Sequence, residues 1–239
     1  QMWLDGLYMG APFYAQYAVT FKDTAGITDV ARQFEIVHSH TYNAQVGLNY
    51  HGWDESKAQQ WADSITGCSP NFWGRAEGWY FMALVDALDF MPKKHPQYKQ
   101  LVAILNQVAA GVVKYQADNG LWYQVLDQGN REGNYFESSA SSMFCYALAK
   151  SVRLGYISNS YIPTIKKAYN SIVHEFVKDN GNNTISITRG CAVAGLGGKP
   201  YRSGSFEYYI GEPIRDNDPK AVGPFIMACL EMQTLLTAK

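Results

Sequence analysis

The sequence lacks a long uncharged apolar run, although 47% of its 239 residues are hydrophobic. Charged and polar residues interrupt each apolar stretch before it reaches the roughly 20 residues that a membrane-spanning helix needs. The chain also does not open with a basic segment, an apolar core and a cleavage site. We therefore expect a soluble protein with no membrane partner. The sequence leaves open whether it is cytoplasmic or periplasmic.

An excess of charge of one sign is also absent, and cysteine is scarce. The formal net charge is -1, which gives no reason to expect nucleic acid as a partner. The HxH formed by His38 and His40 places its two rings on different sides of a helix, so a shared metal is not expected. No CxxC pair indicates a zinc site or a redox motif. We expect mostly buried, free thiols at the four cysteines, Cys68, Cys145, Cys191 and Cys229.

The sequence does contain helical periodicity of two kinds. Three segments are amphipathic with a 3.6-residue period, at 27–43, 98–116 and 162–179. Four others are apolar nearly all round and begin near Trp3, Trp79, Ser138 and Ala221. A helix with no polar face is normally buried on every side. Because the two kinds alternate, we predict an all-α fold of the α/α-barrel type, in which an outer ring of helices wraps an inner ring.

The connections between these segments differ in length. Residues 46–72, 118–136 and 178–217 each lead from an outer-type helix to an inner-type one, whereas the returns are short. These long connections include strand-like sequence at 120–127 and 183–190. Long ordered connections are usually functional. We therefore expect one rim of the barrel to carry these loops and the starts of the inner helices, with Asp5, Arg75, Glu77, Glu137, Glu207, Glu212, Arg215 and Asp218.

Individual rim carboxylates have more than one interpretation. Asp5 stands in the apolar stretch MWLDGLYMGAPFYAQY, where it is either a helix N-cap or a proton donor whose neutral form is favoured by low polarity. Glu137 precedes two serines and Asp218 precedes a proline, and we interpret both as helix caps.

Aromatic residues surround an arginine in the segment NFWGRAEGWY. Trp73 and Trp79 flank Arg75, and YHGWD adds His51 and Trp53. Aromatic faces stack on sugar rings, and a guanidinium grips a carboxylate in a bidentate manner, so this set suits an acidic sugar. The alternative is that both tryptophans belong to the core and that Arg75 bridges structural carboxylates.

Several blocks together resemble a known family. WLDGLYMGAPFYAQYA, NYHGWDESKAQQWAD, SPNFWGRAEGWYFMALVD, GNYFESSASSMFCYALAK and SFEYYIGEPIRDNDPKAVGPFIMA are similar, in this order, to the unsaturated rhamnogalacturonyl hydrolases of glycoside hydrolase family 105, relatives of the family 88 unsaturated glucuronyl hydrolases. The resemblance implies an (α/α)6 barrel and an oligosaccharide substrate ending in a 4,5-unsaturated galacturonyl residue. It implies a reaction in which an aspartic acid protonates the vinyl-ether double bond, water adds at C5, and the hemiketal opens and releases the next sugar.

Block matching also assigns roles to residues. It implies that Asp5 is the acid/base and that His51, Trp73, Arg75 and Trp79 contact substrate, with no metal and no cofactor. Family members are longer, and residues 1–239 correspond to the C-terminal two-thirds of the family fold. We therefore expect an incomplete barrel, because the chain is a fragment or because a missing segment or another chain completes it.

Three other functions remain open at this point. The chain could be an unsaturated glucuronyl hydrolase acting on glycosaminoglycan-type fragments. It could instead be a carbohydrate-binding barrel without catalysis. Lastly, it could be an ordinary two-carboxylate glycosidase in which Glu77, Glu137 or Glu207 is the partner of Asp5.

Overall fold

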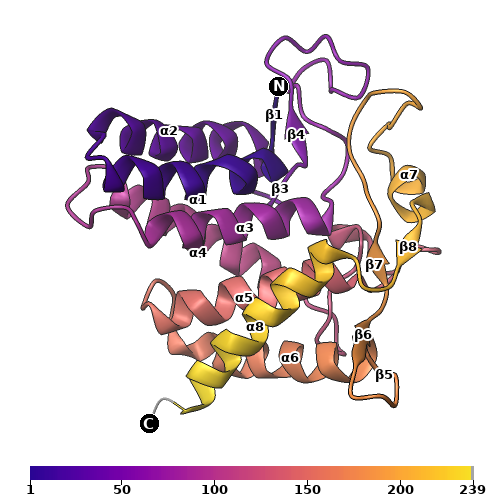
Figure 1. Ribbon diagram of the computed structural model, residues 1–239. Helices are drawn as coiled ribbons and strands as arrows, with labels where there is room; N and C mark the ends of the chain where they lie inside the picture. Colours follow the sequence, from indigo (N-terminus) through magenta and orange to yellow (C-terminus); the bar gives the residue numbers. More distant parts are fainter. Residues whose placement is uncertain (238–239) are drawn as a thin grey trace.

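The computed structural model describes residues 1–237 and consists mainly of helices (Figure 1). The α-helices are α1 (Leu4–Thr20), α2 (Thr24–Thr41), α3 (Gly74–Leu88), α4 (Tyr98–Lys114), α5 (Ser138–Arg153), α6 (Ile162–Phe176), α7 (Phe206–Gly211) and α8 (Pro219–Thr237). Two short 3-10 helices occur at Leu126–Gln128 and Asn159–Tyr161. The seven helices expected from periodicity are confirmed, and the short α7 is an addition.

The helices form an inner row and an outer row. Helices α1, α3, α5 and α8 pack side by side in that order, and α2, α4 and α6 pack on the outside of this row. The outer helices bury one stripe, such as Ile165, Ala168, Ile172 and Phe176 on α6. By contrast, almost every residue of α3 and α5 is buried. The alternation in the sequence therefore predicts the layers correctly.

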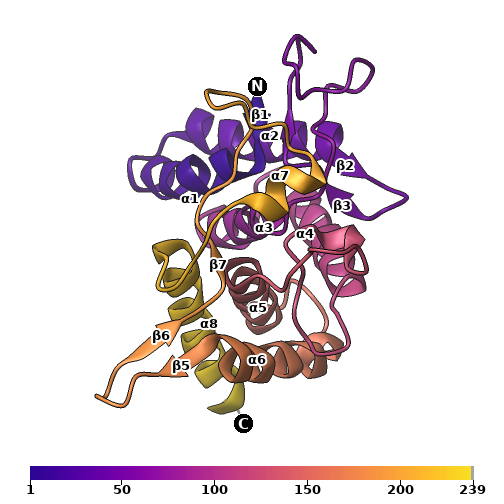
Figure 2. The same cartoon turned by 90° about the vertical axis from the view of Figure 1, so that its right-hand side faces the viewer.

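Two-stranded antiparallel ribbons lie at the rim where the inner helices begin. The pairs are β1 (Met2–Trp3) with β4 (Gly52–Trp53), β2 (Tyr42–Asn43) with β3 (Leu48–Asn49), β5 (Val177–Asp179) with β6 (Ile185–Ile187), and β7 (Gly190–Cys191) with β8 (Ile214–Arg215). Figure 2 looks onto this rim, with α7 in front of α3. The long connections thus gather on one side, as expected.

The strand-like segment 120–127 does not form a strand. It makes isolated bridges, with Trp73 opposite Val125 and Tyr123 opposite Phe136. Its apolar residues are instead buried over the helices, where the Trp122 indole donates a hydrogen bond of 2.7 Å to the Val112 carbonyl. Apolar content in this loop therefore reflects packing on the core rather than a sheet.

The capping carboxylates take the roles that the sequence predicts. Glu137 accepts hydrogen bonds from the backbone N–H groups of Ser139 and Ala140 at the start of α5. Asp218 accepts from the Lys220 N–H at 3.0 Å, directly before α8. These three bonds satisfy N–H groups that have no partner within the helix.

The two end helices of the inner row, α1 and α8, expose apolar side chains, so the expectation that they are buried on every side is wrong for residues 1–237. On α1 these include Met9, Phe13 and Tyr17, with Phe21 directly after the helix, and on α8 they include Ile226 and Leu230. Within residues 1–237, none of the helices combines the length and the apolar character that crossing a membrane requires. The free thiols are confirmed, with Cys68, Cys145 and Cys191 buried and Cys229 half-buried.

Candidate active site

Asp5 lies in the first turn of α1 and does not cap it. The N-cap position belongs to Trp3, which has no side-chain capping bond, so the N-cap interpretation of Asp5 is wrong. The Leu4 N–H donates to the His51 carbonyl at 3.0 Å, which ties the start of α1 to the segment carrying His51. The Asp5 side chain is 22% exposed although its Oδ2 atom is buried, so its exposed part lies on the Oδ1 side.

His51 connects Asp5 to a tyrosine on α7. Its Nε2 atom lies 3.0 Å from Asp5 Oδ2, although the ring is not aligned as a hydrogen-bond donor to that oxygen. Its Nδ1 atom lies 2.7 Å from the Tyr209 hydroxyl. A hydroxyl either donates or accepts, so both neutral tautomers of the imidazole keep a partner at Nδ1. The imidazole is therefore able to face either a protonated or an ionised Asp5.

Aromatic rings enclose His51. Trp3 meets it edge-on with ring centroids 5.4 Å apart, and Trp73 lies at 4.9 Å. Trp73 also stacks on Tyr209 at 5.7 Å. Gln124 bonds to both residues of this pair. Its side-chain oxygen accepts a hydrogen bond from the Trp73 indole at 3.0 Å, and its side-chain NH2 donates one to the Tyr209 carbonyl at 3.1 Å. His51 is fully buried and Trp73 nearly so, so both lie beneath Asp5 rather than on the open surface.

Arg75 is turned towards α5. Its Nε donates to the Ser139 hydroxyl at 2.7 Å, and its Nη2 contacts Glu137 at 3.5 Å and the Cys191 carbonyl. The residue is only 1% exposed, and its guanidinium carbon lies 5.5 Å from the Trp73 ring. The structure therefore shows the bridging of a structural carboxylate that the sequence offered as an alternative. A contact with substrate stays a prediction.

Trp79 belongs to a second aromatic group. It stacks on Tyr8 of α1, with ring centroids 4.5 Å apart and planes inclined by 28°. Tyr8 is three residues after Asp5, so the two side chains share a helix face. The Trp79–Tyr8 pair therefore lies about one helical turn below the carboxylate, apart from the rings around His51.

The other rim carboxylates do not join Asp5. Glu207 is exposed and pairs with Arg131, whereas Glu137 is occupied by its cap and by Arg75. Glu77 is fully buried and accepts from the Asn49 N–H at 3.1 Å. Burial raises the pKa of Glu77 to about 8. Because Glu77 and Glu137 are fully buried and Glu207 is paired with an arginine, the structure does not favour any of the three as the second carboxylate of a glycosidase.

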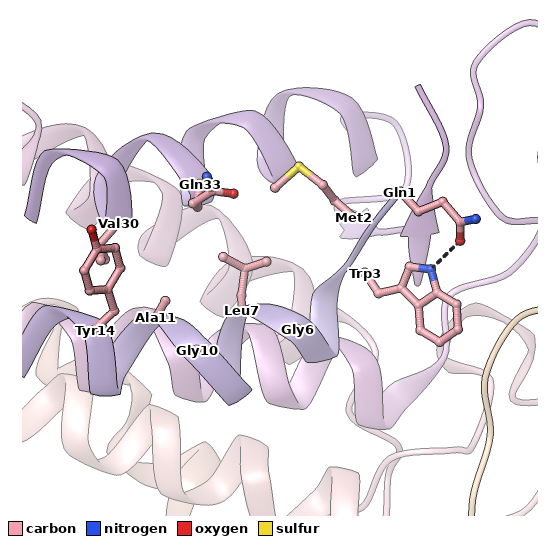
Figure 3. A pocket seen from close by; sticks show the side chains of 10 residues that line it. All are labelled: Gln1, Met2, Trp3, Gly6, Leu7, Gly10, Ala11, Tyr14, Val30 and Gln33. Carbon is pink, nitrogen blue, oxygen red and sulfur yellow. Dashed lines mark hydrogen bonds between the residues drawn. The ribbon is translucent and has the colours of Figure 1, made fainter. Parts of the chain in front are cut away.

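A groove beside the site faces the opposite side of α1. It has a volume of about 360 Å³ and lies between α1 and α2 (Figure 3). Gly6 and Gly10 leave its floor open, and Tyr14, Val30 and Gln33 lie further along it. Asp5 is not part of this lining. In the described part of the chain, no group of three or more His, Cys, Asp or Glu side chains is arranged to hold a metal ion.

The sequence did not single out Tyr209, Trp3 or Gln124 as site residues. Tyr209 stands in the block SFEYYIGEPIR, where the charged residue Glu207 was the more evident candidate for a site residue. The hydrogen bond between His51 and Tyr209 spans 158 residues of sequence. No local pattern indicates a pairing over such a distance.

Comparison with solved structures defines the class of protein. A glycoside hydrolase from family 105 of C. acetobutylicum superimposes with a TM-score of 0.95 at 48% identity, covering 98% of this chain and 65% of that one. The arc of paired helices with Asp5 and His51 at its rim is thus the fold of an α/α-barrel glycoside hydrolase.

Comparison of sequences defines the family. The model of Glycosyl Hydrolase Family 88 matches residues 1–236, and the chain belongs to this family of glycosidases. A 24.9 kDa protein in the picA locus of Rhizobium radiobacter is 38% identical over 97% of this chain and 100% of its own length. The unsaturated rhamnogalacturonyl hydrolase YesR of Bacillus subtilis is 27% identical over 78% of this chain and 49% of its own length. The chain thus spans about half of YesR and about two thirds of the solved relative. The resemblance to families 105 and 88 is confirmed.

Proposed function

We propose that this chain carries the catalytic residue of an unsaturated rhamnogalacturonyl hydrolase. The proposed reaction releases a 4,5-unsaturated galacturonyl residue from pectin-derived oligosaccharides. The observation that carries it is the contact of Asp5 with His51, 3.0 Å apart at the rim of the inner helices. Family membership and the similarity to YesR support the choice of substrate.

The contact suits a carboxyl group that must both give and take a proton. In the proposed reaction neutral Asp5 transfers its proton to C4 of the sugar, and the double bond becomes an oxocarbenium ion centred on C5. The resulting carboxylate then removes a proton from water as the oxygen adds to C5. The hemiketal that forms opens and releases the next sugar. His51 holds the Oδ2 side of Asp5, which leaves the more exposed Oδ1 side for this exchange.

The positions of the aromatic residues and of Arg75 around Asp5 suggest what each of them does in the proposed reaction. Tyr8 is half-buried and packs against the buried Trp79, so the pair is a mostly buried aromatic group one turn below Asp5, which in this proposal contacts a sugar ring. Trp73 and His51 form the buried support of the acid. Arg75, whose charge is balanced by Glu137, lies behind them and packs against the Trp73 ring. In this proposal His51, Trp73 and Arg75 act mainly from below the substrate.

The exposed apolar sides of α1 and α8 bear on the activity of residues 1–239. A large apolar patch marks a surface that another protein segment covers. We propose that further helices close the barrel along these two sides, as the additional third of the longer solved relative suggests.

The test is the ultraviolet absorbance of an unsaturated galacturonyl-rhamnose disaccharide mixed with the purified chain. Hydration destroys the double bond, so absorbance falls if the proposal holds. An unsaturated glucuronyl disaccharide of the glycosaminoglycan type, run in parallel, distinguishes the other substrate class of the family. Binding of either sugar without loss of absorbance would indicate a carbohydrate-binding barrel.

A further inference from the structure

Glu77 is a buried carboxyl group that the proposed reaction does not use. It lies in the first turn of α3 with no exposed surface. Its Oε2 atom accepts one hydrogen bond, from the Asn49 backbone N–H, and its Oε1 atom has no hydrogen-bond partner within residues 1–237. The guanidinium of Arg75, two residues earlier, is engaged on α5. A carboxylate in such surroundings would be an unpaired buried charge, which is strongly unfavourable.

The groups packed around Glu77 supply no compensating charge. Tyr80 is on the same helix, and burial raises the pKa of its hydroxyl well above the ordinary value. His38 of α2 contacts the side chain of Asn49, whose backbone N–H donates to Glu77, and burial lowers the pKa of the His38 ring. Both groups are therefore uncharged near pH 7. Burial also raises the pKa of Glu77 to about 8, in agreement with a neutral acid.

Asn49 links Glu77 to the catalytic contact. Its side chain donates to the Thr41 hydroxyl at 2.9 Å and lies 3.3 Å from His38 Nδ1, so α2 holds it from the other side. His51 follows two residues later on the same extended segment. Glu77 therefore fastens α3 to the segment that places His51 beside Asp5.

We propose that Glu77 is a positioning residue that works as a neutral acid and holds residues 48–51, and with them His51, in register against Asp5. Its effect on turnover rests on the proposed function, whereas its protonation and its effect on His51 do not. Glutamine has the shape of the neutral acid and keeps the acceptor for Asn49. Leucine has a similar volume but leaves the Asn49 N–H unpaired.

The first measurement is unfolding by urea between pH 5 and pH 8 for the unmodified chain and for Glu77→Gln. A pKa near 8 in the folded chain, against an ordinary value near 4.5, means that only the folded state holds this proton between those limits. Stability is then highest at low pH and falls as pH rises towards 8. Relative to Glu77→Gln, the unfolding equilibrium constant should rise about tenfold per pH unit. Glu55→Gln, at an exposed position, is the control and should track the unmodified chain.

The second measurement follows the His51 ring by NMR, with its signals assigned from a His51→Gln variant. Glu77→Gln should leave them in place, and Glu77→Leu should shift them. Parallel pH profiles for Glu77→Gln and the unmodified chain, or unshifted His51 signals in Glu77→Leu, would overturn the proposal. If Glu77→Leu does not fold, the pH profile of Glu77→Gln alone decides. Absence of turnover in the unmodified chain would count against the proposed function and leave both readouts intact.

Discussion

His51 Nδ1 lies 2.7 Å from the hydroxyl of Tyr209, while the opposite nitrogen of the same ring lies 3.0 Å from Asp5 Oδ2. The three side chains come from a loop, from α7 and from the start of α1. Their contacts bring together segments separated by most of the chain. Because His51 and Tyr209 are fully buried, the exposed end of this series is the carboxyl group alone. The chemistry proposed for Asp5 therefore depends on an orientation fixed from within the fold.

Replacing Asp5 by asparagine removes the proton donor and keeps the shape of the side chain. Because general acid–base catalysis contributes about 100- to 10,000-fold, turnover of the unsaturated disaccharide should fall by at least about 100-fold. The loss of ultraviolet absorbance measures it. Asp118→Asn, at an exposed position, is the matched control and should keep full activity. Near-normal turnover in Asp5→Asn would remove Asp5 from the mechanism.

Replacing Tyr209 by phenylalanine leaves His51 Nδ1 without its partner. An unsatisfied buried polar group costs about 1–3 kcal/mol, so the free energy of unfolding should drop by about that amount. The ring also loses the bond that fixes its orientation, so kcat should fall and the pH profile of kcat should shift. Tyr201→Phe, at an exposed position, should change neither. Unchanged kcat with reduced stability would mean that Tyr209 supports the fold only.

Much of the architecture follows from the sequence, and the reasons are local. Helices such as α4 and α6 are predictable because burial repeats along them with a helical period, and α3 is predictable because its segment is apolar nearly all round. The caps Glu137 and Asp218 are predictable because capping depends on the next few residues. Asp5 and His51 were singled out by their apolar and aromatic surroundings, and the resemblance assigned their roles. By contrast, α7 is too short to show a period, and the contact of Tyr209 with His51 depends on tertiary packing.

Glu137 combines a helix cap with a buried ion pair, and its loss should be more harmful than loss of a cap alone. In Glu137→Gln, Arg75 keeps its charge in a buried place without a counter-charge. Removing one partner of a buried pair costs about 3–5 kcal/mol, whereas losing a cap costs about 1 kcal/mol. Asp218→Asn, which affects a cap whose ion pair with Lys220 is partly exposed, is the comparison. Urea unfolding of both variants tests this, and equal losses would contradict a buried charge at Arg75.

Substitution of Trp79 tests whether this residue binds the sugar or supports Asp5. It stacks on Tyr8 below Asp5 and has no contact with the rings around His51 among the described residues. If a sugar ring stacks there, Trp79→Ala should raise KM by about tenfold, from a stacking energy of about 0.5–1.5 kcal/mol and the lost apolar contact. Because the Asp5–His51 contact is untouched, kcat should change much less. Trp79→Phe keeps an aromatic face and should restore most of the affinity. If Trp79→Ala lowers kcat instead, with KM unchanged, the tryptophan acts on the position of α1 and not on the substrate.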